Sequence, residues 1–503
     1  MKIVICGGGT AGWLAALMIR KVQKDSHDIT VIDSSKIGII GAGEGSTGYL
    51  LDIIQNNSWN YNCNEEDFFR ETGATVKLGI EHRDWSGKGK TYFAPIDGTG
   101  TSNQIPDNRL CYALLNDLPF HTSSENGYYI EHNKANYWYE NDKLSSTKSN
   151  AYHFDGHKVG QYFKKICLAD KVKHIDAEIL DVRVDETGIK SLLLSNEQEI
   201  FADFFIDCTG FARKLVSALD VSWTSYSKNL TVNSAMPFLL DYEENEKIKP
   251  VTVAWAQGSG WMWKIPVANR WGCGYVYDDN FISDDQAKDE IEKVLGKKIE
   301  PIKLLKFDTG RLDKPWYKNC LALGLAAAFA EPLEATSIHS TILQLTTFIF
   351  DYLKDTKEQT VNIGCQNIYN KKTTHMYDSF KDFLNLHYQT KRNDTEFWKW
   401  MSSGETKTEF VADILELVKN KIPKGPDIGG FYGSAGSALW NWILIGLGYI
   451  NKEKAQEELN FYGSDINLTN LSWKLYHETI STESKKMYDN TEFIKKINGN
   501  HLS

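Results

Sequence analysis

Near its N-terminus the chain reads Lys2-Ile3-Val4-Ile5-Cys6-Gly7-Gly8-Gly9-Thr10-Ala11-Gly12. The apolar run before Gly7 predicts a short buried strand, and apolar side chains at helical spacing predict a helix from Ala11 to Lys21. Gly7 permits a tight turn, Gly9 lets the backbone approach a pyrophosphate, and Gly12 allows helix and strand to pack closely. Thr10 and Ala11 open the helix, whose N–H groups and dipole favour a phosphate. This order predicts a Rossmann-type nucleotide-binding unit.

A second strand and an acidic residue follow at the expected distance. Residues 29–32 form another apolar β-branched run, and it ends at Asp33, which is 21 residues after Gly12. A carboxylate at this place in the fold binds a ribose hydroxyl. A turn residue or a helix cap is the structural alternative for Asp33.

Three further segments favour FAD over NAD. Residues 41–47 form a second glycine-rich loop that can wrap a large flat cofactor. Residues 202–210 and 321–327 resemble the second and third FAD contacts of the glutathione-reductase-like flavoproteins. In aromatic hydroxylases of that superfamily an aspartate follows the third-motif glycine, whereas Leu325 stands here, which disfavours a hydroxylase. The additional cofactor-binding candidates are Gly43, Glu44, Asp207, Gly210 and Gly324.

Composition and charge exclude several classes of protein. The net charge is −10 and no basic run is present, whereas a nucleic-acid partner would need a basic face. Eight cysteines without paired spacing indicate neither a disulfide framework nor a metal site. No apolar run reaches the roughly 18 residues that cross a bilayer. Because the sequence opens on the first predicted strand, we expect no leader segment. We expect a cytoplasmic protein without a membrane partner, and a homodimer is compatible with the sequence.

A second motif, Gly260-Trp261-Met262-Trp263-Lys264-Ile265-Pro266, lies in the middle of the chain. Two tryptophans two positions apart are often one face of a core strand. Combined with the nucleotide-binding N-terminus, however, this segment resembles the flavin-dependent halogenases, whose mark is W-x-W-x-I-P on an FAD-binding scaffold. Ordered matches to the tryptophan-halogenase branch include residues 74–80, 151–155, 274–277, 310–311, 316–320, 331–336, 387–388 and 397–398.

The resemblance implies an enzyme that uses FADH2, O2 and halide to make hypohalous acid and to halogenate an electron-rich aromatic ring. It implies that Trp261 and Trp263 keep organic substrate away from the flavin. Lys77 matches the essential lysine, which relays the halogen as a haloamine or polarises hypohalous acid by a hydrogen bond. Glu334 matches the essential carboxylate, which stabilises the cationic ring and accepts its proton. Glu331 is the nearest alternative to Glu334.

Thr336 and Ser337 match the loop whose backbone N–H groups bind halide. Backbone amides suit a halide because it needs a cradle of partial positive charge. The family commonly has Ser-Thr-Gly here, but this chain has Ala335-Thr336-Ser337. The larger residue at 337 leaves chloride, bromide and iodide open as the halide.

The expected substrate is an aromatic compound other than free tryptophan. Tryptophan halogenases stack the indole between a histidine and a phenylalanine that flank a proline. The corresponding stretch, residues 92–96, has Ala94 and Ile96 at those two places. Candidates for a replacement aromatic wall are Tyr92, Phe93, Trp440 and Trp442.

The expected fold is α/β, a glutathione-reductase-like FAD-binding fold with an inserted β-rich substrate region and a mainly helical C-terminal region. We expect a discontinuous FAD module over 1–345, interrupted by inserts at about 91–154 and 216–304. A helical substrate-binding region is expected over 346–503, with a lid near residues 432–436. The single nucleotide fingerprint implies that a separate flavin reductase supplies FADH2. An FAD-dependent aromatic monooxygenase and a catalytically inactive flavin-binding protein are the competing hypotheses.

Overall fold

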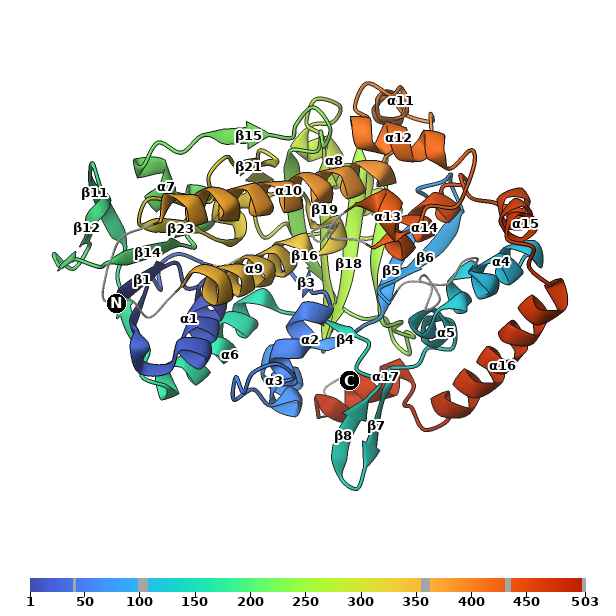
Figure 1. Cartoon of the computed structure of the whole chain (residues 1–503), viewed down its shortest axis with the longest axis horizontal. Coiled ribbons are helices and arrows are strands. Elements are labelled where there is room, and N and C mark those ends of the chain that lie inside the picture. The colour runs from blue at the N-terminus through green and yellow to red at the C-terminus, as the bar shows by residue number, and fades with distance from the viewer. Residues whose placement is uncertain (39–41, 98–106, 354–361, 430–435, 500–503) are drawn as a thin grey trace. The chain divides into compact units, whose positions relative to one another are not determined.

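The computed structural model describes residues 1–38, 42–97, 107–353, 362–429 and 436–499 (Figure 1). Gly41 of the second glycine loop and residues 432–435 of the expected lid lie outside the described residues. The chain divides into two compact units, whose segments are Met1–Gly73, Phe154–Ser227 and Phe307–Asp378 for unit 1 and Ala74–His153, Lys228–Lys306 and Ser379–Ser503 for unit 2.

The N-terminal strand lies inside a six-stranded sheet in unit 1, with strand order β10-β2-β1-β14-β23-β22. All neighbours pair in parallel except β22, which is antiparallel to β23. The bounds are β1 Lys2–Cys6, β2 Asp28–Asp33, β10 Lys173–Asp176, β14 Phe204–Asp207, β22 Trp316–Tyr317 and β23 Cys320–Ala322. The predicted Rossmann-type sheet is therefore present, and its inner strands β1, β14 and β23 are largely buried, as expected for a parallel sheet that helices cover.

The helices of unit 1 begin with α1, Thr10–Gln23, which packs beside α6, Gly156–Ala169 (Figure 1). The α1 residues from Gly12 to Arg20 are all buried, since the helix lies between the sheet and other helices. Further helical segments of unit 1 are η1 Lys24–Ser26, α2 Gly48–Ile54, α3 Glu65–Thr72, η3 Gly210–Ala212, α7 Lys214–Ala218, η4 Gly324–Ala326, η5 Pro332–Glu334, α9 Thr336–Thr347 and η6 Phe348–Tyr352. Two small three-stranded sheets complete the unit: β11 Ile179–Asp185, β12 Gly188–Leu194 and β13 Glu199–Ile200, and β15 Trp223–Ser225, β21 Gly310–Leu312 and β24 Ala328–Phe329.

Unit 2 is built on a seven-stranded sheet with order β20-β16-β19-β18-β17-β5-β6. Its strands are β5 Gly79–Arg83, β6 Thr91–Pro95, β16 Ser234–Leu240, β17 Val251–Ala256, β18 Gly260–Val267, β19 Arg270–Tyr277 and β20 Leu305–Lys306. Strand β4, Thr75–Lys77, pairs with β9, Ala151–Phe154. One face of the large sheet forms an apolar core with α8, Asp284–Leu295, in which Met262 and Tyr275 are fully buried.

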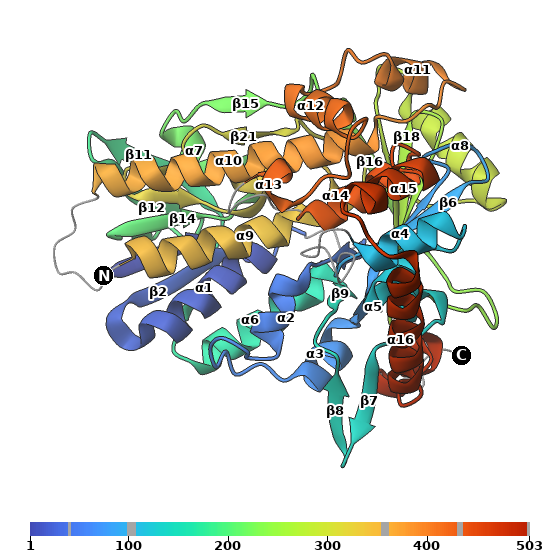
Figure 2. The ribbon, with the colours of Figure 1, turned by 45° about the vertical axis from the view of Figure 1, so that its right-hand side comes forward.

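Helices make up most of the C-terminal part of unit 2. In Figure 2, α15 and α16 run close to α4, which packs against each of them. The bounds are α4 Asn108–Leu115, α5 Glu125–Glu131, α11 Glu396–Ser402, α12 Glu409–Leu417, α13 Gly425–Ile428, α14 Ser437–Gly446, α15 Lys452–Phe461, α16 Ile466–Ser484 and α17 Asn490–Ile497. Helix α10, Ile363–His387, contributes residues to both units.

The unit boundaries differ from the sequence expectation in three places, one of which is that residues 216–227, assigned to an insert, belong to unit 1. Residues 74–90, assigned to the FAD module, belong to unit 2, because β5 pairs with β6 and β17 of the large sheet. Residues 346–378, assigned to the C-terminal region, belong to unit 1. Among the described helices, none combines the length and the apolar character needed to cross a bilayer.

Candidate active site

The turn after β1 has the geometry of a phosphate cradle. Gly7 has φ +112°, and a Cβ atom there would lie 2.2 Å from the carbonyl oxygen of Cys208, so only glycine fits. A Cβ atom at Gly12 would lie 1.9 Å from the Gly7 carbonyl oxygen. At Gly9 no described atom beyond the chain neighbours lies within 4 Å of the Cβ position, so the backbone is open there. Gly9 is the N-cap of α1 and has no side chain to bond the first backbone N–H groups, so the turn fits a pyrophosphate.

Asp33 ends β2 beside this turn. A Cβ atom at Gly8 would lie 1.7 Å from Asp33 Oδ2, so the carboxylate rests directly on the Gly8 backbone. The carboxylate is also hydrogen-bonded to His174 on the neighbouring strand β10. Asp33 therefore lies at the carboxyl end of a parallel strand, next to the glycine turn, and its binding of a ribose stays a prediction.

Glu44 lies against the start of α6. A Cβ atom at Gly156 would lie 1.8 Å from Glu44 Oε1, and Thr10 Oγ1 donates a hydrogen bond to the Gly156 carbonyl oxygen at 3.1 Å. Burial, and then the charge of Asp155, raise the pKa of Glu44 from 4.5 to about 7. Asp155 is held there because it caps α6 by accepting hydrogen bonds from the first backbone N–H groups. The loop thus carries a carboxyl group that changes charge near neutral pH.

The turn after β14 is held together by Asp207, which is fully buried. Its Oδ1 accepts hydrogen bonds from the backbone N–H and hydroxyl of Thr209 at 2.9 and 2.7 Å. Its Oδ2 accepts from the backbone N–H groups of Leu215 and Val216 at 2.9 and 3.0 Å. Asp207 therefore shapes the turn rather than offering an oxygen to a ligand. Gly210, with φ +67° and open space at its Cβ position, remains the accessible candidate.

Gly324 connects the third predicted segment to α1 and α9. A Cβ atom at Gly324 would lie 3.1 Å from the Ala11 Cβ and 3.7 Å from Thr341 Oγ1. The cofactor candidates from five segments of the sequence are thereby gathered around the start of α1, all within unit 1. Gly43, with φ +84°, turns the chain into Glu44.

The start of α9 has the geometry of an anion site. Ala335 has the left-handed conformation, φ 54° and ψ 38°, which non-glycine residues adopt at a cost of about 1–2 kcal/mol. No side chain caps the helix, so the backbone N–H groups of Thr336 and Ser337 point out of its end. The hydroxyls of Ser340 and Thr341 donate to the Ser337 carbonyl oxygen and do not compete for these N–H groups. A left-handed residue followed by a helix start is an anion-binding arrangement.

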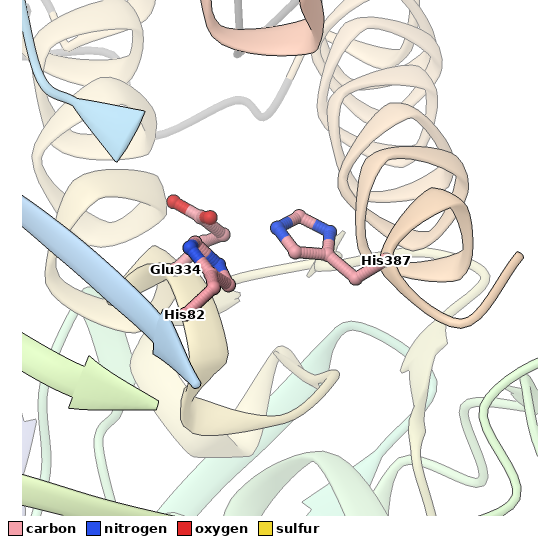
Figure 3. Close-up of side chains that lie close together, drawn as sticks. All are labelled: His82, Glu334 and His387. Atoms are coloured by element: carbon pink, nitrogen blue, oxygen red, sulfur yellow. The ribbon is translucent and has the colours of Figure 1, made fainter. Parts of the chain in front are cut away.

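Glu334, labelled in Figure 3, ends η5, one residue before Ala335. Its side chain is partly exposed. Glu331 begins the same turn but is 1% exposed. Of the two carboxylates in this segment, Glu334 is therefore the more accessible.

Lys77 is the last residue of β4 and is 2% exposed, between the fully buried Val76 and Leu78. His153, on the neighbouring strand β9, is also buried. Burial, and then the charge of Lys77, hold the pKa of His153 well below its usual value. Each ring nitrogen of His153 meets a hydroxyl group, Nε2 with Thr252 Oγ1 at 2.8 Å and Nδ1 with Thr75 Oγ1 at 3.5 Å.

The direction of these hydrogen bonds fixes the tautomer of His153. Thr75 Oγ1 donates to the Pro266 carbonyl oxygen at 2.7 Å, so it can only accept from Nδ1–H. Nε2 then accepts a hydrogen bond from Thr252. Because burial and then Lys77 hold the pKa of His153 well below its usual value, the ring is neutral and adds no second positive charge beside Lys77.

The two tryptophans of the W-x-W segment lie on one face of β18, while Met262 between them faces the apolar core. Their ring centroids are 6.3 Å apart, and Trp261 and Trp263 are 1% and 8% exposed. Trp263 rests on Gly274 of β19, where a Cβ atom would lie 2.1 Å from the indole ring. The pair is packed, as a core strand requires, and this burial is also compatible with a shielding role.

Comparison with known proteins places this geometry in a family. The family model described as "Tryptophan halogenase" matches residues 2–459. The chain belongs to the tryptophan halogenase family. It is 29% identical over 483 residues to a 7-chloro-L-tryptophan 6-halogenase of Kutzneria sp., covering 89% of this chain and 90% of that protein.

Solved structures of flavin-dependent halogenases have the same fold. A tryptophan C-6 flavin-dependent halogenase (chlorinase) from taromycin biosynthesis is 26% identical, with a TM-score of 0.85, covering 99% of this chain and 100% of that chain. A tryptophan 6-halogenase of Streptomyces toxytricini is 24% identical, with a TM-score of 0.86, covering 98% and 99%. The predicted resemblance, the FAD-binding Rossmann-type fold and the assignment to a flavin-dependent halogenase enzyme are confirmed.

Within this tryptophan-halogenase scaffold, the four aromatic residues predicted as a substrate wall separate into two clusters. Tyr92 stacks on His82, with ring centroids 4.7 Å apart and planes at 6°. Trp440 contacts Phe383, which in turn contacts His387. The second cluster contains Phe93, His121, Phe120 and Trp442. The ring centroids are 4.9 Å apart for Phe93 and His121, 6.1 Å for His121 and Phe120, and 5.9 Å for Phe120 and Trp442.

Sequence reasoning missed His82 and His153 and gave His387 no role. His82 stands between two charged residues on β5, Glu81 and Arg83, and the sequence gives no signal that separates it from them. His153 and His387 lie in segments that match the family, but neither segment reveals the partners of the imidazole. The structure shows that all three rings are buried in unit 2.

Proposed function

We propose that this protein is a two-component halogenase, which receives FADH2 from a separate flavin reductase and halogenates an electron-rich aromatic substrate. Membership of the tryptophan halogenase family supports this proposal, as does the glycine cradle of unit 1. When bound, reduced FAD supplies the chemistry that converts O2, a halide ion and a proton into hypohalous acid and water. The single observation that carries the proposal is a family-matching lysine, Lys77, that is buried beside a neutral histidine.

Lys77 is proposed to deliver the halogen. An ammonium group polarises hypohalous acid by donating a hydrogen bond, and a neutral amine takes the halogen as a haloamine with loss of water. The neutral His153 adds no second positive charge beside the buried Lys77. Lys77 is therefore kept dry in a setting where either role is open to it.

Glu334 is proposed to accept the proton that the ring carbon loses after the carbon–halogen bond forms. A carboxylate also stabilises the positive charge of the ring before that proton leaves. Its partial exposure is consistent with contact to a ligand, whereas Glu331 is packed away.

The halide is proposed to bind at the N-terminal end of α9, through the backbone N–H groups of Thr336 and Ser337. The left-handed Ala335 and the uncapped first turn support this assignment. Chloride, bromide and iodide are all candidates, because Ser337 stands where the family commonly has glycine.

Free tryptophan is not the proposed substrate. Ala94 and Ile96 provide no rings at the two stacking places, and a good aromatic pair contributes about 0.5–1.5 kcal/mol beyond burial. The rings available nearby in unit 2, Tyr92 and Trp440, instead belong to the cluster around His82 and His387.

The proposal is tested with a halide panel against phenols, anilines and indoles, with FADH2 regenerated by an unrelated reductase. We expect halogenated products that depend on halide, O2 and reduced flavin. Hydroxylated products without halide would identify a flavin monooxygenase instead. Flavin binding with no product from any substrate would favour the inactive flavin-binding protein.

A further inference from the structure

A row of residues across unit 2 places His82 on the same face of the sheet as the W-x-W motif. The strand registers align Tyr92 with His82, His82 with Ala254, Ala254 with Trp263, and Trp263 with Gly274. Residues aligned across neighbouring strands point to one face. The small Ala254 therefore separates the His82 imidazole from the Trp263 indole.

The neighbours of His82 on this face are aromatic. Tyr92 covers one face of the imidazole, and a Cβ atom at Gly446 of α14 would lie 2.4 Å from the Tyr92 ring, so the tyrosine is clamped in place. The ring centroid of Trp85 lies 6.0 Å from that of His82 and 6.4 Å from that of Trp261. It is fixed by donating a hydrogen bond to the Ala254 carbonyl oxygen at 3.0 Å. His82 is thus held rigidly in an apolar wall.

His82 itself is 0% exposed, and neither ring nitrogen has a well-formed hydrogen bond to a described residue. Its pKa lies well below the usual value, because burial and then the neighbouring His387 disfavour the charged ring and outweigh the nearby Ile80 carbonyl. A buried polar group without a partner costs about 1–3 kcal/mol. Such a group in a rigid wall indicates that a ligand supplies the missing hydrogen bond.

His387, at the end of α10, directs its ring toward His82 (Figure 3). The ring centroids are 5.3 Å apart, and one nitrogen of each ring lies within 4.8 Å of the other. His387 Nδ1 lies 2.9 Å from the Phe383 carbonyl oxygen, which fixes its proton on Nδ1 and makes Nε2 an acceptor. For an atom placed about 2.9 Å from each of the two facing nitrogens, the N···atom···N angle would be roughly 110° or less. Hydroxyl and amino groups make hydrogen bonds at such angles.

We propose that His82 and His387 form a recognition site for a polar hydrogen on the aromatic substrate, an O–H or N–H group attached directly to the ring. The substrate class is therefore phenols, anilines and N–H indoles, as opposed to their O- or N-methylated counterparts. His82 is a specificity-determining residue that accepts this hydrogen bond, while the surrounding rings contact the body of the substrate. This inference rests on the proposed halogenase function and names its substrate class.

The test compares methylated and unmethylated substrates of similar ring reactivity. Phenol is measured against anisole, and indole against N-methylindole, as kcat/KM for halogenation by the reconstituted enzyme with FADH2 and halide. We expect the wild type to prefer each O–H or N–H compound tenfold or more, since a methyl group leaves His82 without its partner. In His82→Phe, which keeps the ring stacked on Tyr92, the preference should fall to within about threefold of unity.

Two further variants test whether the change in preference is specific to His82 and to its hydrogen bond. His121→Phe removes another buried histidine, one that belongs to the separate Phe93 cluster of unit 2, and it should keep the wild-type preference. His82→Gln retains a hydrogen-bonding group and should keep part of the preference. Equal rates for phenol and anisole in the wild type, or a preference that His82→Phe leaves unchanged, would overturn the inference while leaving the halogenase function intact.

If the wild type halogenates neither compound of a pair, the proposed function fails, and calorimetric titration with indole and N-methylindole still decides the inference. Tighter binding of indole that His82→Phe abolishes supports it, and equal binding overturns it. Uptake of one Zn²⁺ per chain that depends on His82, without a preference for indole, would identify a metal site and would also overturn it.

Discussion

The pH dependence of stability should change when Glu44 is replaced by glutamine. In the folded protein, burial and Asp155 raise the pKa of Glu44 from 4.5 to about 7. The folded state therefore binds a proton over a pH range in which the unfolded chain has released it. Stability from this group is fully present below about pH 4.5, and it declines as pH rises through the folded pKa. Glu44→Gln is neutral throughout and lacks this decline.

The magnitude follows from the two pKa values. At about 1.4 kcal/mol for each pH unit between them, the full effect is about 3.4 kcal/mol. Roughly 2.5 kcal/mol of this falls between pH 5 and pH 8, where both states can be measured. The wild type should thus lose about 2.5 kcal/mol more than Glu44→Gln across that range.

Urea titrations of the flavin-free protein, followed by tryptophan fluorescence at pH 5, 6, 7 and 8, measure this difference. Glu186→Gln, which changes an exposed glutamate of unit 1, is the matched control and should follow the wild type. Parallel pH profiles for the wild type and Glu44→Gln would refute the argument, because they would mean that Glu44 titrates alike in both states.

Four further outcomes are expected. Gly7→Ala should weaken FAD binding more than tenfold in a flavin-fluorescence titration, because a Cβ atom there lies 2.2 Å from the Cys208 carbonyl oxygen; unchanged affinity would contradict the cradle. Lys77→Ala and Glu334→Gln should keep FAD binding but lose halogenation to below about 1% of wild type by mass spectrometry, a loss on the scale of acid–base catalysis; more than a few per cent of residual activity in Lys77→Ala would rule out the relay. The purified chain should not oxidise NADH or NADPH without an added reductase, and rapid oxidation would show a second nucleotide site. The kcat/KM for free tryptophan should be lower than for simple indoles and phenols; tryptophan as the best substrate would show that other rings replace the missing stacking pair.

The sequence alone was sufficient for the features that depend on local geometry. Gly7, Gly9 and Gly12 are spaced by the turn and helix start that they build, so their pattern predicted the Rossmann-type unit directly. The W-x-W-x-I-P segment predicted the family in the same way. Both patterns are readable because the residues that matter are neighbours in the chain.

Contacts between residues that lie far apart in the sequence could not be predicted from it. Asp207 was predicted as a cofactor contact, but its carboxylate is used by Thr209, Leu215 and Val216. Whether an acid serves a ligand or a turn depends on which N–H groups surround it, and spacing does not specify that. Glu44 likewise has a raised pKa because the fold buries it and then places Asp155, at the start of α6, beside it.

The unit boundaries and the histidines were decided by tertiary structure. Residues 74–90 belong to unit 2 because β5 pairs with β17, a strand about 170 residues later in the sequence. His82 could be identified as a candidate site residue only from the structure. The strand register places it beside Tyr92 and Ala254, and the end of α10 places His387 opposite it. Pairing between distant strands is set by packing of whole elements, which one residue and its neighbours in sequence do not encode.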